Sequence, residues 1–228
     1  SEDTRYFVKK SKINYDERIV EGDSIYFDRN KSYASATNNI TITDTLNNTI
    51  VKGHFGEVFR DKDSLYITQR ALAITLQEND SIFIHSDTLM VTGKPKKRTI
   101  RAYYNAKIYK SDLSGIADSI HINQHVGLTQ LINIDKSKTK DVFVKKQKPV
   151  LWNIQNQITG DSIHLISNVK TENLDSLKVF NNAFVINKDS LGDGYNQISG
   201  KKLFGLFKDN SLSTIDIIKN AETLYYLR

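Results

Sequence analysis

Hydrophobic and polar residues alternate along most of the chain in short segments. In residues 25–27, 65–67, 82–84, 120–122 and 163–165, the first and third positions are aliphatic or aromatic, while the middle position varies from Tyr to Phe to His. Successive side chains of a strand point to opposite faces, so this period of two is typical of strands with one buried face. No segment keeps a helical period over three turns. The pattern predicts an all-β fold.

A three-residue motif, Asp followed by Ser or Thr and then Ile or Leu, begins many of these segments. The chain contains the motif nine times, whereas random order of the same residues would give about one copy, which favours an internal repeat. The nine aspartates are Asp23, Asp44, Asp63, Asp80, Asp87, Asp118, Asp161, Asp175 and Asp189. Because Asp side chains bond nearby backbone amides in turns, we expect these residues to form the turns that precede strands.

The spacing of the motif suggests a unit of several short strands. Asp23 and Asp63 are 40 residues apart, Asp118 and Asp161 are 43 apart, and Lys201 stands in the place of Asp 40 residues after Asp161. Short strands at such spacing are typical of a meander, a barrel or a stacked-strand solenoid. The motif occurs on both sides of the Lys-rich residues 135–148, so we expect one elongated domain over residues 1–228 with a loop excursion there.

Composition limits the chemistry available to the chain. Hydrophobic residues make up 39% and charged residues 25%, which is ordinary for a chain that folds. No apolar run reaches the length of a membrane-spanning helix, and the absence of Cys excludes disulfides and thiolate chemistry. The chain starts at Ser1 without a leader, so we expect a processed or truncated chain. Much of the net charge of +6 lies in residues 94–98 and 136–148, which we expect to be solvated loops.

Candidate catalytic and metal-binding residues are few. His121 and His125 would share a strand face only at about 13 Å, too far apart for one zinc ion. The aspartates recur at equivalent positions, which favours turn formation over a catalytic carboxylate pair. Aromatic residues do not cluster as they do on nucleic-acid-binding sheets. We therefore expect neither an enzyme nor a metal site, and no nucleic-acid partner.

The C-terminal residues resemble a known family. Residues 194–207 read Gly-Tyr-Asn-Gln-Ile-Ser-Gly-Lys-Lys-Leu-Phe-Gly-Leu-Phe, and residues 209–212, 220–226 and 21–28 continue the likeness. These segments resemble the OstA-like proteins of Bacteroidetes, which are related to the periplasmic bridge of lipopolysaccharide transport (the LptA/OstA class). The resemblance implies a stacked-strand β jelly roll, also called a β-taco, that forms a V-shaped open trough. It also implies a periplasmic, cofactor-free protein that relays lipid A acyl chains toward the outer membrane and joins other transport proteins, or copies of itself, edge to edge.

The aliphatic face of the repeat is the candidate lipid-binding surface. A continuous apolar face must be covered by a second sheet or bind an apolar ligand. By alternation, we expect the groove to be lined by Ile25, Phe27, Leu65, Ile67, Ile82, Ile84, Ile120, Ile122, Ile163 and Leu165. Two alternatives remain open at this point. One is a structural β-solenoid scaffold or adhesin with a fully packed core and no lipid, and the other is a carbohydrate-active β-solenoid enzyme.

Overall fold

The computed structural model confirms the predicted all-β fold. It describes residues 3–15, 17–76, 80–94, 97–133, 147–171, 173–189, 192, 194–209 and 211–226. Within these residues every regular element is a β-strand except one short 3₁₀ helix, Arg60–Lys62, and none is a helix long and apolar enough to cross a membrane. The chain forms two compact units, Ser1–Ala106 and Lys107–Arg228, and the boundary falls inside strand β7 (Thr99–Lys110). The expectation of a single domain therefore stays a prediction.

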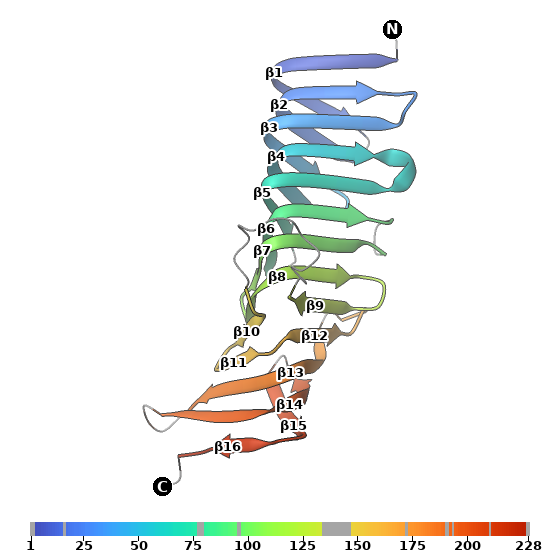
Figure 1. Cartoon of the computed structure of the whole chain (residues 1–228). Helices are drawn as coiled ribbons and strands as arrows, with labels where there is room; N and C mark the ends of the chain where they lie inside the picture. Colours follow the sequence, from blue (N-terminus) through green and yellow to red (C-terminus); the bar gives the residue numbers. More distant parts are fainter. Residues whose placement is uncertain are drawn as a thin grey trace. The chain divides into compact units, whose positions relative to one another are not determined.

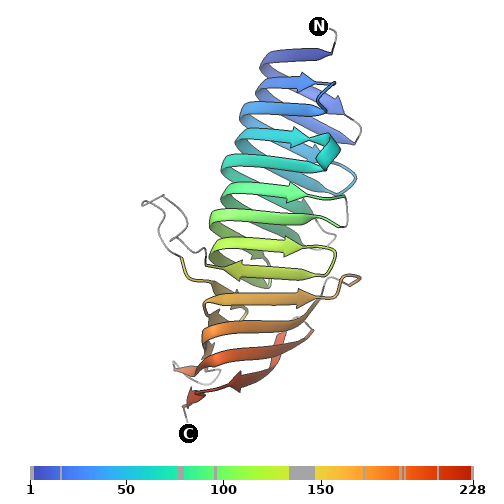
Figure 2. The same ribbon diagram turned by 45° about the vertical axis from the view of Figure 1, so that its right-hand side comes forward.

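The N-terminal unit is an antiparallel meander in which each strand pairs with the next (Figures 1 and 2). Its strands before β7 are β1 (Thr4–Tyr15), β2 (Arg18–Asp28), β3 (Tyr33–Asp44), β4 (Thr49–Phe59), β5 (Ser64–Leu76) and β6 (Ser81–Thr92). Turns of a few residues connect them, and this local pairing needs no long crossover.

The C-terminal unit builds some of its long strands from two short ones. Its elements are β8 (Leu113–Asn123), β9 (Leu128–Ile132), β10 (Val150–Asn153), β11 (Asn156–Thr159), β12 (Ser162–Ser167), β13 (Leu174–Lys188), β14 (Tyr195–Lys208), β15 (Ser211–Ile218) and β16 (Glu222–Leu224). The two halves of β8 pair with β10 and β9, those of β13 with β11 and β12, and those of β14 with β16 and β15. Most of the predicted excursion at residues 135–148 lies outside the described residues; it falls between β9 and β10, which both pair with β8.

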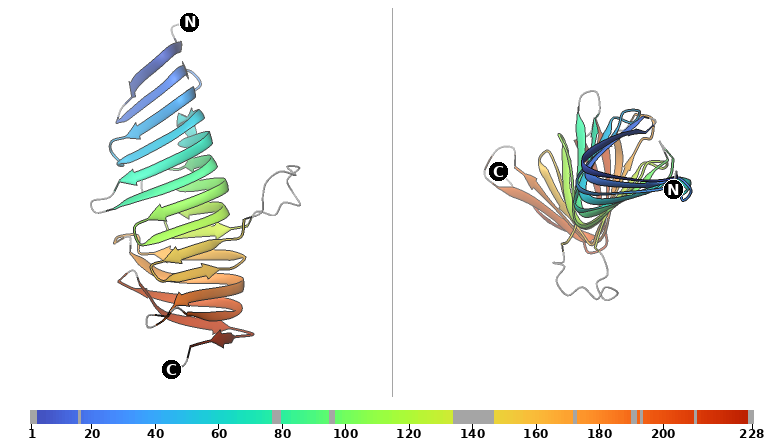
Figure 3. Two further views of the ribbon diagram at one scale, coloured as in Figure 1. Left: turned by 90° about the vertical axis from the view of Figure 1, so that its left-hand side faces the viewer. Right: turned by 90° about the horizontal axis from the view of Figure 1, so that it is seen from above.

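Most of the long strands bend sharply at a corner near their middle (Figure 3). At the corners of β1, β3, β5 and β13, two consecutive residues adopt positive φ and stand opposite one residue of a neighbouring strand, which shifts the register of the pair. Such bulges bend a strand and re-aim its side chains. Among the described residues, the pairs with positive φ within strands are Lys9-Lys10, Asn38-Asn39, Gln69-Arg70, Tyr104-Asn105 and Asn181-Asn182, and Lys219-Asn220 lies between β15 and β16.

The corners correct our interpretation of the repeated aspartate. Asp23 and Asp87 lie inside β2 and β6 rather than in turns before them, and Asp161 lies at the corner between β11 and β12. Each accepts a hydrogen bond from the side-chain amide of a corner asparagine on a nearby strand. The bond to Asp23 comes from Asn39 (2.8 Å), that to Asp87 from Asn105 (2.7 Å) and that to Asp161 from Asn182 (3.2 and 3.1 Å). Asp63 and Asp80, in contrast, directly precede strands as predicted.

The predicted unit of about 40 residues is wrong for the N-terminal unit. The residues that stand opposite successive corners there are Asp23, His54 and Asp87, which are 31 and 33 residues apart. The repeat is thus a pair of bent strands, and the 40-residue spacing arose from comparing the corner residue Asp23 with the loop residue Asp63. Lys201 does take the corner position, opposite Asn181-Asn182, as the sequence indicated.

Small residues occupy the inside of the corners. A Cβ on Gly53 would lie 2.7 Å from Cγ1 of Ile67, and a Cβ on Gly160 would collide with Val179. At Gly53 and Gly160 the neighbouring side chains leave no room for a Cβ, so a larger residue does not fit at these two positions.

Candidate functional site

The inner faces of the bent strands carry most of the buried apolar residues of each unit. In the N-terminal unit we call residues 24–28, 33–37, 55–59, 64–68 and 88–92 the first arm, and residues 18–22, 40–44, 49–53, 71–76 and 81–86 the second arm. Pairing across the first arm aligns the buried row Ile25, Ala36, Gly56, Ile67 and Leu89 beside the corner. On the second arm it aligns the buried residues Ile42, Val51, Ala73 and Ile84. Both arms thus present aliphatic rows inward.

Exposure rises from the corner toward the strand ends. Ile25, Ile67 and Ile84 of the predicted groove are buried, whereas Phe27, Leu65 and Ile82, two residues further from the corner, are half-buried. Phe27 and Leu65 share a row with Ala34, Val58 and Val91 of the first arm, and these five residues are half-buried. The row ends on β1 at Arg5, which pairs with Phe27 and is exposed. The row furthest from the corner is the accessible part of the apolar face.

An ionic cluster lies at the strand ends of the N-terminal unit. Asp44, the last residue of β3, lies 3.5 Å from Nε of Arg18 and 3.4 Å from Nη2 of Arg98. Asn47 donates to it from its backbone and side-chain nitrogens, at 3.0 and 2.8 Å. Burial alone raises the pKa of Asp44, but the hydrogen bonds from Asn47 and the charges of Arg98 and Arg18 outweigh it and hold that pKa below its ordinary value.

Arg98 is therefore not part of a solvated loop, as its charge run had suggested. Its side chain is only 14% exposed because it reaches Asp44 on the second arm from the β6–β7 connection. This contact joins the free ends of opposite arms.

The C-terminal unit has apolar rows of its own. Its corner row consists of Ile120, Leu131, Ile163, Val179 and Leu203, paired strand by strand, and all five side chains are at most 2% exposed. The next row contains Ile122, Leu165 and Leu177; Leu165 and Leu177 are buried, and Ile122 is half-buried. The predicted residues of this unit therefore lie together on the inner face.

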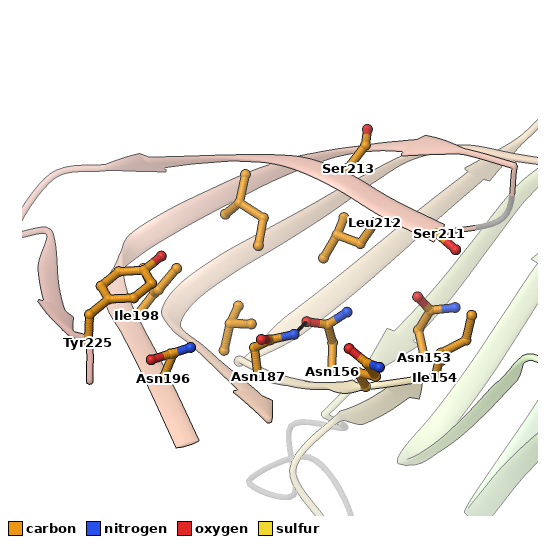
Figure 4. A pocket seen from close by; sticks show the side chains of 13 residues that line it. Asn153, Ile154, Asn156, Asn187, Asn196, Ile198, Ser211, Leu212, Ser213 and Tyr225 are labelled. Atoms are coloured by element: carbon orange, nitrogen blue, oxygen red, sulfur yellow. Dashed lines mark hydrogen bonds between the residues drawn. The ribbon is translucent and has the colours of Figure 1, made fainter. Parts of the chain in front are cut away.

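A cavity of about 400 Å³ opens at the C-terminal end of this unit (Figure 4). Its floor includes Val185 and Ile198, and Leu212 and Ile215 of β15 line its other wall. Four asparagines on adjacent strands, Asn153, Asn156, Asn187 and Asn196, form a row along its edge, each paired in register with the next. Among the described residues that line the cavity, none is charged.

The asparagine row and the aliphatic cavity residues Val185 and Ile198 were not predicted from the sequence. The sequence does contain a pattern that could have predicted the row. In β10, β13 and β14 an Asn lies two residues from an aliphatic residue, as in Leu151 and Asn153 or Val185 and Asn187. Alternation alone did not say which strands are neighbours, so the row became visible through the pairing.

The middle residues of the motif face outward, as predicted. His164 packs against Phe180, with the ring centroids 4.8 Å apart and the ring planes tilted by 59°, and lies 3.2 Å from the Gln130 amide. Burial lowers the pKa of His164, and the charge of Lys178 lowers it further. Among the described residues, no three His, Asp or Glu side chains gather in a way that could hold a metal ion.

The fold and interior define a stacked all-β protein with an inward-facing apolar surface. No protein-family model matches the chain, and no curated protein matches its sequence. Its solved structural neighbours include the crystal structure of LptH, the LptA-homologous periplasmic component of the lipopolysaccharide transport device from Pseudomonas aeruginosa. That match has a TM-score of 0.49 and 11% identity, and covers 59% of this chain and 93% of the other.

Proposed function

We propose that this protein is a periplasmic component of lipopolysaccharide transport that binds the acyl chains of a lipid on the inner faces of its bent strands. The observation that carries the proposal is the graded inner face, in which packed rows at the corner give way to half-buried residues such as Phe27, Leu65 and Ile122. An apolar surface that is continuous and partly exposed favours an apolar ligand. The OstA-like sequence segments support the same function.

The physical chemistry of the inner face suits acyl chains. Each methylene group that leaves water contributes about 0.8 kcal/mol. A chain of a dozen such groups thus gains roughly 10 kcal/mol before the entropy of ordering it is subtracted. The row of Ile82 is polar, since pairing aligns Ile82 with Thr75, Thr49 and Asp44. The first-arm row from Phe27 to Val91 is apolar, with Arg5 in register at its β1 end, so it offers an alkyl chain the less polar path.

The proposal includes partners and assigns no catalytic step or cofactor. The partners are lipopolysaccharide or a related lipid and other transport proteins. A homo-oligomer through edge strands is part of the same proposal. Within the described sheet, strand β1 pairs with β2 only, and β15 and β16 each pair with β14 only. These strands are therefore edges of the sheet, to which a strand of another chain can be added.

Lipid extraction tests the function. We expect organic extracts of the purified protein, or of protein incubated with lipopolysaccharide and repurified, to contain acylated lipid in mass spectra. The substitution Leu65→Trp fills the half-buried row and should reduce the amount recovered, whereas Tyr66→Trp on the opposite face of β5 should not. Protein that folds and yields no lipid in either preparation would instead support a fully packed structural scaffold.

A further inference from the structure

The asparagine row at the C-terminal cavity has the features of a binding site for a polar group. Neighbouring strands in a sheet lie about 4.8 Å apart, so Asn153, Asn156, Asn187 and Asn196 span roughly 14 Å. A second, aliphatic row lies on the same face of these strands, two residues away from each asparagine. It consists of Leu151, Ile158, Val185 and Ile198. An amide row thus runs parallel to an aliphatic row, roughly 7 Å away along the strands.

We propose that the asparagine row binds the uncharged polar region of a glycolipid, where acyl chains join the sugar through amide or ester groups. The proposal rests on the proposed function, since the half-buried cavity residues Ile198, Leu212 and Ile215 would hold the acyl chains. Asparagine offers both donors and an acceptor on one short side chain, which matches hydroxyl groups and carbonyls together. The described residues that line the cavity carry no charge, which favours this region of the ligand over a phosphate group.

The hydrogen bonds of the row leave polar atoms available to a ligand. The Asn187 amide donates to the carbonyl of Asn156 at 2.9 Å, and the Asn196 carbonyl accepts the backbone N–H of Tyr226 at 3.3 Å. Asn153 donates to the backbone carbonyl of Asp112 at 2.9 Å. Within the described part of the chain, Nδ2 of Asn156 and Oδ1 of Asn187 have no hydrogen-bond partner, although both residues line the cavity.

A purely structural asparagine ladder would be bonded differently. In stacked β-structures such ladders link each amide to the next along the stack. Here one amide–amide bond joins the four side chains among the described residues, and Asn156, Asn187 and Asn196 are half-buried rather than buried. Figure 4 shows Asn156, Asn187 and Asn196 lined up along the cavity, with the aliphatic wall of Leu212 and the phenol of Tyr225 around it.

Comparing two ligands tests the inference. We would measure binding of an N-acylglucosamine glycolipid without phosphate and of the free fatty acid with the same acyl chain. For Asn187→Leu we expect a loss of glycolipid affinity of about tenfold or more, from the hydrogen bonds removed, and little change for the fatty acid. Gln197→Leu, on the opposite face of the neighbouring strand β14, is the matched control and should change neither affinity.

The outcomes separate the inference from the proposed function. An unchanged ratio of the two affinities in Asn187→Leu, or equal losses for both ligands, would overturn the role of the asparagine row while lipid binding stands. If unmodified protein binds neither ligand, the proposed function fails and the inference fails with it. Should Asn187→Leu not fold, as judged by circular dichroism, Asn187→Ser removes the amide without adding bulk, and a selective loss of glycolipid affinity is again expected.

Discussion

At the residue scale, two kinds of side chain hold the bent strands in place. Small residues fill the inside of the corners, and polar residues such as Asp23 and Asp87 tie their outside to corner asparagines. The repeated aspartate marks several corner positions in the sequence. The alternation of hydrophobic and polar residues nevertheless predicted that these aspartates lie in turns before strands. Gly22 and Ile25 both face inward although they are three residues apart, so the alternation restarts at Asp23 and imitates the beginning of a strand.

The packing inside a corner predicts different outcomes for two glycines. Gly53→Ala should cost about 1–3 kcal/mol in the free energy of unfolding, because the new Cβ would lie 2.7 Å from Ile67. Gly22→Ala is the control; its Cβ would meet its nearest atom at 3.6 Å, so stability should stay the same or rise slightly. Urea unfolding monitored by circular dichroism measures both. Equal effects of the two substitutions would contradict the close approach at Gly53.

The cluster around Asp44 predicts a dependence of stability on pH. The folded-state pKa of Asp44 lies below its unfolded value of about 3.9, so the ionised side chain stabilises the fold above that pH. This contribution is lost as pH falls from there through the lowered folded-state pKa. Asp44→Asn should cost about 1–3 kcal/mol at pH 7 and should flatten this part of the unfolding profile between pH 5 and 2. An unchanged profile would show that the contacts of Asp44 with Arg98 and Arg18 contribute little.

At the scale of the element, the unit of the structure is the bent strand rather than the hairpin turn. Alternation predicted the existence of strands because the buried face follows a period of two. It could not reveal that β1, β3 and β5 each continue through a corner, since two residues in the left-handed region look like a break in the pattern. Asn38-Asn39 and Asn181-Asn182 are signals for this conformation, but Lys9-Lys10 and Gln69-Arg70 have the same geometry without the favoured residue type.

The corner geometry predicts a stabilising substitution. Gln69 and Arg70 have φ values of 64° and 61°, a conformation that costs most residues about 1–2 kcal/mol and asparagine less. The double substitution Gln69→Asn and Arg70→Asn, which copies the corner of β3, should therefore raise the free energy of unfolding by about 1 kcal/mol. Thr68→Asn, at the extended residue just before the corner, is the control and should not stabilise. Chemical denaturation distinguishes the cases, and a double variant that is less stable than the wild type would contradict the account.

At the scale of the whole molecule, the same construction recurs in both units. Each places aliphatic rows on the inner face, and the C-terminal unit adds an uncharged amide row at its cavity. The alternation that the motif predicted places residues such as Ile25 and Leu165 on the inner face, and their binding of lipid stays a prediction. The alternation could not predict how far each is covered, because coverage depends on distance from a corner that the linear pattern does not mark. Ile67 and Leu65 lie two residues apart on one face, yet the first is buried and the second half-buried.

Site-specific photocrosslinking on β8 tests the central claim most directly. Ile122 lies on the inner face and His121 on the outer face of the same strand, so a photoreactive amino acid at each position forms a matched pair. After irradiation with lipopolysaccharide, we expect a lipid adduct from position 122 and none, or far less, from position 121, read out by mass spectrometry. Equal adducts at both positions, or no adduct at position 122 in folded protein, would contradict lipid binding by the inner face.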